Sequence, residues 1–216
     1  LTCGDGIVGD NWPTIAILPK GKTNALTVDL GVPIDWNLQD AIEAFDKGGR
    51  TVRRPIEVSD LEKGPSSRVL GFLMGAGAFT TAVKDGQSAH RLGAFNSAVV
   101  TVTAAWGIAQ ALFASRANPW RRGAKMNIAL GKSASPMAHS GMGDPDYRQI
   151  LLATTLEGLP AGLKPFGKLR SGLRMVALDQ VGRRTTALLP LIVTGKIQSG
   201  LREKGIHQLS VPEFTL

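Results

Sequence analysis

The sequence has one cysteine, Cys3, among 216 residues, and one tyrosine, Tyr147. A lone cysteine excludes an internal disulfide and a thiolate cluster for zinc or iron–sulfur, which favours a reducing, cytoplasmic setting. Aromatic residues make up 6% of the chain, so stacking platforms for bases are few and nucleic-acid binding is disfavoured. Three histidines, His90, His139 and His207, show no metal-ligand spacing, and we expect them at the surface.

The chain also lacks a starting methionine and the basic start and apolar core of a signal peptide. We therefore expect an incomplete chain. One charge-free stretch, Leu92 to Ser115, is long enough for a membrane span to be considered. Polar residues interrupt it and its apolar residues are mostly small, so a buried or interfacial helix is the better interpretation.

Glycine, proline and positive charge are abundant. The 26 Gly and 12 Pro favour many turns and short elements over a helical bundle. Lys and Arg number 25 against 17 Asp and Glu, a formal net charge of +8, so the surface should attract phosphate in some form. Nucleotide and anionic lipid are both compatible with this charge.

The first fifty residues have an α/β pattern. Thr14 to Leu18 is a short apolar run between prolines, typical of a buried parallel strand. Ala25 to Leu30 predicts a short helix ending at Gly31, and the apolar spacing after Leu38 predicts another that stops at Gly48.

From Thr51 onward short apolar runs between glycines and prolines predict an antiparallel, sheet-rich domain with one helix at about Gly93 to Phe113. The expected strands are Val69 to Met74, Met126 to Leu130, Ile150 to Thr154 and Leu173 to Leu178. The predicted fold is a partial α/β nucleotide-binding domain over 1–50, followed by a β-rich, sandwich-like α+β domain over 51–216.

Two glycine-containing loops flank the predicted first strand, CGDGI at Cys3 to Ile7 and PKGKTN at Pro19 to Asn24. Glycine lets backbone N–H groups approach an anion closely, so such loops can hold phosphates. Asp5, between two glycines, could orient a magnesium-bound water or a reacting hydroxyl.

In this order the loops resemble the diacylglycerol kinase and NAD kinase superfamily. That family carries Gly-Gly-Asp-Gly-Thr after a strand, and its diacylglycerol kinase branch adds Pro-x-Gly-Thr-x-Asn, a short helix and Leu-Gly. The second loop and its continuation, PKGKTNALTVDLG, give the stronger match. Arg50 to Val58 and the glycine-containing GFLMGAGAFTTAV at Gly71 to Val83 are similar to the family's passage into its second domain.

The resemblance implies an ATP-dependent lipid kinase that transfers the γ-phosphoryl of ATP to a lipid hydroxyl, by default that of diacylglycerol, with Mg²⁺ as cofactor. It implies a cytoplasmic enzyme, peripheral at the inner membrane surface, that meets its lipid on an anionic membrane. A homodimer stays open, and no metal-ligating residue is identified. The site residues it implies are Asp5 for catalysis and Gly4, Gly6, Gly21, Lys22, Thr23 and Asn24 for the nucleotide.

Departures from the family's motifs define two alternatives. Cys3 and Ile7 replace a motif glycine and threonine, Lys22 stands where the second loop usually has a hydroxyl, and no late Asp-Gly-Glu supplies the general base. A noncatalytic member that binds nucleotide or lipid therefore stays open. An NAD kinase is the other alternative; its Asn-Glu motif is absent.

Three further patterns are weighed against simpler interpretations. AILPKGKT at Ala16 to Thr23 is one glycine short of a P-loop with MVALD at Met175 to Asp179 as its magnesium strand, but Ala16 falls inside the predicted strand. AHSGMGDPD at Ala138 to Asp146 places Ser beside His without the Gly-x-Ser-x-Gly turn of a hydrolase, so it is interpreted as a loop.

Basic clusters are interpreted as solvated faces, or as membrane-docking sites where they share a side with Trp120 and Phe166. These clusters are Arg53-Arg54, Arg121-Arg122 with Lys125, Lys164 with Lys168 and Arg170, and Arg183-Arg184.

Overall fold

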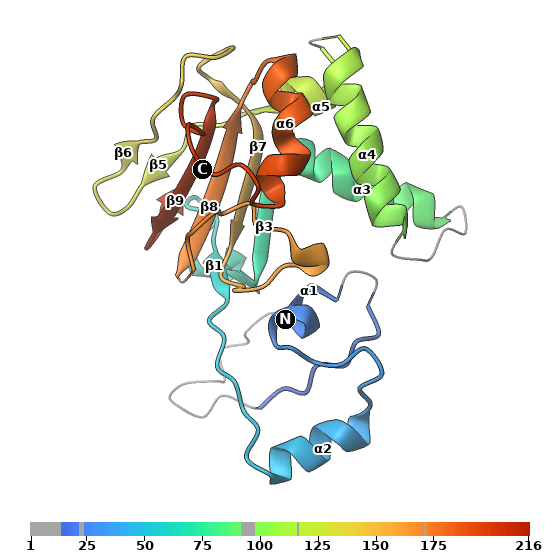
Figure 1. Ribbon diagram of the computed structural model, residues 1–216. Helices are drawn as coiled ribbons and strands as arrows, with labels where there is room; N and C mark the ends of the chain where they lie inside the picture. The colour runs from blue at the N-terminus through green and yellow to red at the C-terminus, as the bar shows by residue number, and fades with distance from the viewer. Residues whose placement is uncertain (1–13, 22–23, 92–97, 116, 171) are drawn as a thin grey trace. The chain divides into compact units, whose positions relative to one another are not determined.

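The computed structural model describes residues 14–21, 24–91, 98–115, 117–170 and 172–216, with the backbone alone for 88–91 and 98–105. The contacts divide the chain into two compact units, Leu1–Met74 with Thr155–Pro160, and Gly75–Thr154 with Ala161–Leu216. Helices alternate with several antiparallel sheets, so the fold is mixed α+β (Figure 1). The predicted change of domain at Thr51 stays a prediction.

The first unit contains the two helices that the sequence predicted. Helix α1 (Ala25–Asp29) is followed by Gly31 at φ 68°, and α2 (Leu38–Asp46) is followed by Gly48 at φ 80°. Asn37 begins α2 with a capping box, accepting from two backbone N–H groups of the first turn. Strands β1 (Ile56–Val58) and β2 (Val69–Gly71) pair antiparallel around the short helix η1 (Gly64–Ser67).

The strand predicted at Thr14 to Leu18 is wrong. These residues have no regular secondary structure, and Ile15 is 58% exposed. A parallel strand needs a neighbour to accept and donate its backbone hydrogen bonds. Within the described ranges no strand pairs with this segment, so its apolar run alone does not make a strand.

The second unit is built on a five-stranded sheet with the order β3-β7-β8-β9, to which β4 adds by pairing with β7. The predicted strands at 150–154 and 173–178 are confirmed as parts of β7 and β8, whereas 126–130 forms a strand only at its end. A second sheet has the order β10-β5-β6. The strands are β3 (Leu73–Gly77), β4 (Ala124–Lys125), β5 (Ala129–Leu130), β6 (Ser135–Pro136), β7 (Tyr147–Thr154), β8 (Leu173–Asp179), β9 (Ile206–Val211) and β10 (Phe214–Thr215), and a short helix, η2, spans Pro160–Gly162.

The second unit holds more helix than the sequence predicted. Besides α4 (Ala98–Phe113), which agrees with the expected helix, it contains α3 (Ala78–Arg91), α5 (Pro119–Arg122) and α6 (Arg183–Val193). The sequence of α6 has Thr185 and Thr186 in its first turn and Pro190 in its interior, residues that lower helix propensity. Among the described residues, no helix has both the length and the apolar character that a membrane span requires.

The two faces of the large sheet have different surroundings because side chains alternate along each strand. On one face, Leu178 of β8 and Ile206 of β9 pack with Ile192 of α6 in a buried apolar cluster. On the other face, Met175 and Ala177 are fully buried and Asp179 follows them in the same alternation. The sheet therefore carries an apolar layer under α6 and, on its opposite face, a row that ends in a buried carboxylate.

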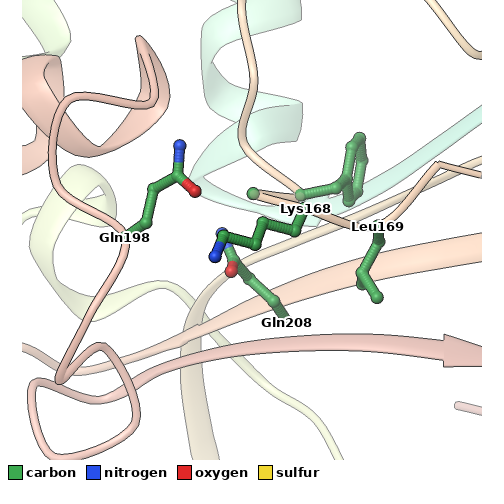
Figure 2. A pocket seen from close by; sticks show the side chains of 6 residues that line it. Lys168, Leu169, Gln198 and Gln208 are labelled. Carbon is green, nitrogen blue, oxygen red and sulfur yellow. The ribbon is translucent and has the colours of Figure 1, made fainter.

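A small pocket lies beside β9 in the second unit (Figure 2). Its cavity volume is about 190 Å³. It is lined by Phe166, Gly167, Lys168, Leu169, Gln198 and Gln208.

Candidate functional site

The structure describes two of the residues that the sequence assigned to a phosphate site, Gly21 and Asn24. The other assigned residues lie outside the described ranges: Gly4, Asp5, Gly6, Lys22 and Thr23.

Gly21 and Asn24 lie close together before α1. A Cβ added at Gly21 would be 3.1 Å from the Asn24 side-chain oxygen. Asn24 adopts the left-handed conformation, φ 47° and ψ 36°, which asparagine tolerates better than most residues. The Asn24 side-chain amide donates to the Pro19 carbonyl at 3.5 Å. The Asn24 backbone carbonyl accepts from the Thr27 hydroxyl at 2.9 Å. Asn24 therefore contacts residues on both sides of it, Pro19 and Thr27.

A buried ion pair holds the end of α1. The Asp29 side chain is fully buried and accepts from Arg53 Nε at 2.7 Å and from the Gly158 backbone N–H at 2.6 Å. The hydrogen bond to Asp29, against an opposing effect of desolvation, raises the pKa of Arg53. Arg53 also contacts Glu157, so three chain segments meet at this carboxylate. The expectation of a solvated face is wrong for Arg53, whose side chain is 19% exposed.

We expect Asp29→Asn to lower the free energy of unfolding by about 2 kcal/mol, because the half-buried Arg53 then keeps only the exposed Glu157, at 3.5 Å, as a counter-charge. The matched control is Glu57→Gln, which removes the exposed pair with Arg68 and should cost less than about 1 kcal/mol. Urea unfolding of the two variants measures the difference. Equal costs would show that the Asp29 pair contributes no more than a surface pair.

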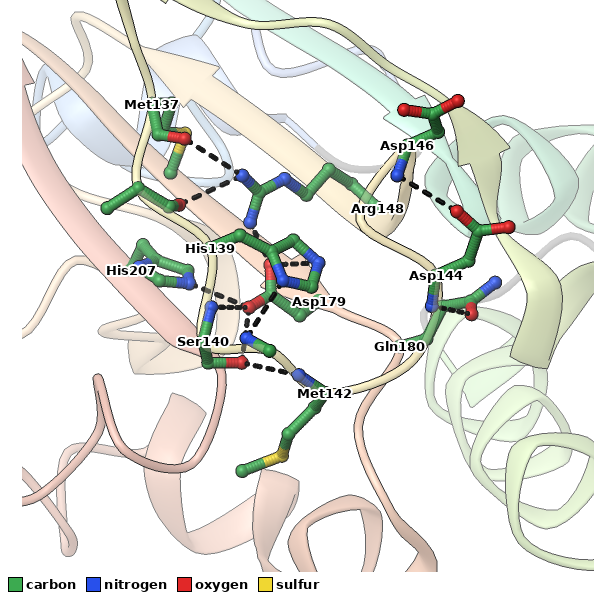
Figure 3. A network of polar contacts seen from close by, with 12 residues as sticks. Met137, His139, Ser140, Met142, Asp144, Asp146, Arg148, Asp179, Gln180 and His207 are labelled. Atoms are coloured by element: carbon green, nitrogen blue, oxygen red, sulfur yellow. Dashed lines mark hydrogen bonds and ion pairs between the residues drawn. The ribbon is translucent and has the colours of Figure 1, made fainter.

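The second unit contains a polar network centred on Asp179, the last residue of β8 (Figure 3). One carboxylate oxygen accepts from the Ser140 backbone N–H at 2.8 Å, the Ser140 hydroxyl at 2.5 Å and His207 Nε2 at 2.9 Å. The other accepts from the Arg148 guanidinium, which also donates to the carbonyls of Met137 and Ala138. Strands β7, β8 and β9 and the segment after β6 are thus joined by one carboxylate.

The carboxylate of Asp179 stays ionised in this setting. Burial by itself would raise its pKa, but the hydrogen bonds from His207 and Ser140 and the charge of Arg148 outweigh burial and lower the pKa well below its ordinary value. With its oxygens engaged and its side chain fully buried, Asp179 is suited to hold strands and loop together. It is not suited to accept a proton from a substrate.

The histidines differ from the expectation of surface positions. His207 is 4% exposed, and the His139 side chain is 14% exposed, with Nδ1 accepting from the Gly141 backbone N–H at 2.9 Å. The side chain of His90 lies outside the described part. The burial of His207 depends on its hydrogen bond to Asp179, which is distant in the sequence. The only sequence signal for this site was an acidic residue, Asp179, at the end of an apolar run.

The segment from Ala138 to Asp146 is a loop, as predicted. Its serine is not activated as in a hydrolase, because the Ser140 hydroxyl donates to Asp179 rather than to a histidine. The P-loop alternative also loses its magnesium ligand, since the Asp179 carboxylate is occupied by protein donors. The sequence argument against a P-loop, that Ala16 lies inside a strand, was wrong because residues 14–18 form no strand.

Within the part of the chain that the structure describes, no group of three or more His, Cys, Asp or Glu side chains could hold a metal ion. Comparisons of the chain with family models, with curated proteins and with solved structures find no match.

Proposed function

We propose that the protein is an ATP-dependent lipid kinase similar to the diacylglycerol kinases. The observation that carries the proposal is the segment from Pro19 to Gly31, whose motif residues follow the family's order. The close approach of Gly21 and Asn24 supports it, since a Cβ at Gly21 would lie 3.1 Å from the Asn24 side-chain oxygen. The short α1 and its glycine stop at Gly31 continue the same pattern.

In this proposal the chain's own residues position the reactants. Backbone N–H groups at Gly4, Gly6 and Gly21 approach the phosphates, with Lys22 as a nearby cation. Asp5 orients the attacking hydroxyl. ATP supplies the phosphoryl group, and magnesium bound to its phosphates would offset their negative charge during the transfer.

The proposal includes a domain layout, in which an α/β nucleotide-binding domain is followed by a β-rich lipid-binding domain. The charge distribution supports the lipid side. The second unit has 17 Lys and Arg against 6 Asp and Glu, a formal net charge of +11, whereas the first has 8 against 11, or −3. An anionic membrane surface would attract the second unit in particular.

The test is phosphorylation of diacylglycerol in mixed anionic vesicles by the full-length protein with ATP and magnesium. We expect a phosphorylated lipid whose rate of formation falls about a hundredfold or more in Asp5→Ala. The control, Asp35→Ala, changes an exposed aspartate and should leave the rate within about twofold. A lipid product that forms equally in both variants would remove Asp5 from the mechanism.

A noncatalytic member of the family is the second candidate, favoured by Ile7, Lys22 and the absence of Asp-Gly-Glu in the chain. Nucleotide binding without any lipid product would select it. Phosphorylation of NAD in the same assay would instead select an NAD kinase.

A further inference from the structure

The loop that borders the pocket in the second unit is hydrogen-bonded to side chains around it. Its loop, residues 165–170, presents three alternate carbonyl groups to side chains of the same unit. Pro165 accepts from Gln208 at 2.6 Å, Gly167 from Arg170 at 3.1 Å and Leu169 from Arg174 at 3.2 Å. Because these carbonyl oxygens already accept hydrogen bonds, less of their negative potential reaches the cavity.

The lining of the pocket includes the buried side chain of Phe166. Phe166 is 3% exposed, and the guanidinium of the buried Arg174 lies 5.2 Å from the centre of its ring. Gly167, at φ 58°, fits closely against the Gln208 amide, since a Cβ there would lie 2.6 Å from its side-chain oxygen.

One cationic residue lines this pocket, and three more contact its lining residues or lie next to them. Lys168 lines it, with its side chain extending past Gln208 in Figure 2. Lys164 is next to it, because a Cβ at Gly195 would meet both Lys164, at 3.3 Å, and the pocket residue Gln198, at 3.4 Å. Arg170 and Arg174 are joined to the loop through the carbonyls described above.

Two of these cations, Lys164 and Lys168, are exposed lysines. Between Glu157 and Asp179 the sequence contains these four cations and no acidic residue. Among the described residues, neither Lys164 nor Lys168 forms an ion pair with a carboxylate, in contrast to Lys125, which pairs with Asp146. A small concave site lined by Lys168, with Lys164 beside it, is suited to an anion.

We propose that this pocket binds the phosphate group of a phosphate ester, with Lys168 as its principal cation and the Gln198 and Gln208 amides as neutral partners. The cavity of about 190 Å³ corresponds to roughly six water volumes. It therefore accommodates a phosphate together with a small alcohol, as in the headgroup of an anionic phospholipid or a free sugar or glycerol phosphate. The site lies in a different unit from the proposed nucleotide loops and does not depend on kinase activity.

The test uses two probes of one chemistry, glycerol 3-phosphate in solution and vesicles containing phosphatidic acid in phosphatidylcholine. Binding of glycerol 3-phosphate is followed by NMR through the side-chain amide signals of Gln198 and Gln208, and vesicle binding by cosedimentation. We expect Lys168→Ala to weaken the binding of at least one probe about fivefold or more. The matched control is Lys132→Ala, an exposed lysine of the β5–β6 turn, which should weaken it less than about twofold.

The outcomes separate the sources of the phosphate. Shifts of both amides by glycerol 3-phosphate, lost in Lys168→Ala alone, support a site for free esters. Selective loss of phosphatidic acid binding in the same variant, without shifts by the soluble ester, supports a lipid headgroup. Equal weakening in the two lysine variants, or no binding of either probe, overturns the proposal, because only diffuse surface charge then remains. Lys168 is exposed, so the variant is expected to fold, and its backbone amide spectrum verifies this.

Discussion

Asp179→Ala is expected to lower the free energy of unfolding by about 3–5 kcal/mol. The change removes a carboxylate that accepts from Ser140, Arg148 and His207. Arg148 is 4% exposed and would keep its charge without a carboxylate partner. A buried cation left in this way costs more than the lost hydrogen bonds themselves. The loop after β6 would also lose its main attachment to the sheet.

The matched control is Asp146→Ala, which removes a surface ion pair with Lys125 and should cost less than about 1 kcal/mol. Guanidinium unfolding of both variants, with hydrogen exchange in β7 and β8 as a local measure, gives the comparison. If Asp179→Ala costs no more than Asp146→Ala, the network contributes nothing beyond ordinary surface charge.

The same carboxylate predicts a pH dependence of stability. Because folding lowers the pKa of Asp179, its contribution is complete above the unfolded pKa of about 3.9 and decreases as the pH falls from there toward the folded pKa. The wild-type protein should therefore lose stability in acid more steeply than Asp179→Ala does. Parallel declines of the two proteins below about pH 4 would contradict this assignment.

Local signals in the sequence were sufficient for several elements. Helices α1 and α2 were predictable because glycine stops and apolar spacing act within a few residues. Strands β7 and β8 were predictable because their apolar runs are bounded by polar or glycine-containing segments. These signals do not depend on which distant segment each element meets.

The polar network could not be predicted in the same way. Its donors come from residues 140, 148 and 207 and meet Asp179 only after three strands pair. Neither His207 nor Arg148 has a local pattern that distinguishes it from a surface residue. The strand predicted at residues 14–18 failed for the related reason that a strand is defined by its partner. The candidate phosphate loop could be named from sequence because its motif is contiguous.

Gly123→Ala is expected to destabilise the second unit by about 3 kcal/mol or more, through backbone geometry rather than charge. Gly123 joins α5 to β4 at φ 69° and ψ −141°, a region open chiefly to glycine. A Cβ there would lie 2.1 Å from the Arg148 carbonyl oxygen and 2.4 Å from the Gln149 Cα. These are backbone atoms of β7, so the clash cannot be relieved by a side-chain rotation. The clash can be relieved only if β4 moves away from β7. This movement would disturb β7, the strand that positions Arg148 against Asp179.

The matched substitution, Gly86→Ala, should have the opposite sign. Gly86 lies within α3, and a Cβ added there meets nothing within 4 Å. Alanine in a helix interior is more stable than glycine by about 0.5–1 kcal/mol, so this variant should unfold at a higher denaturant concentration than the wild type. Both variants replace one hydrogen with a methyl group. A difference between their stabilities therefore reports the local backbone conformation and packing and not the change of residue type. Equal stabilities would contradict the close approach of Gly123 to β7, since that contact is what separates the two positions.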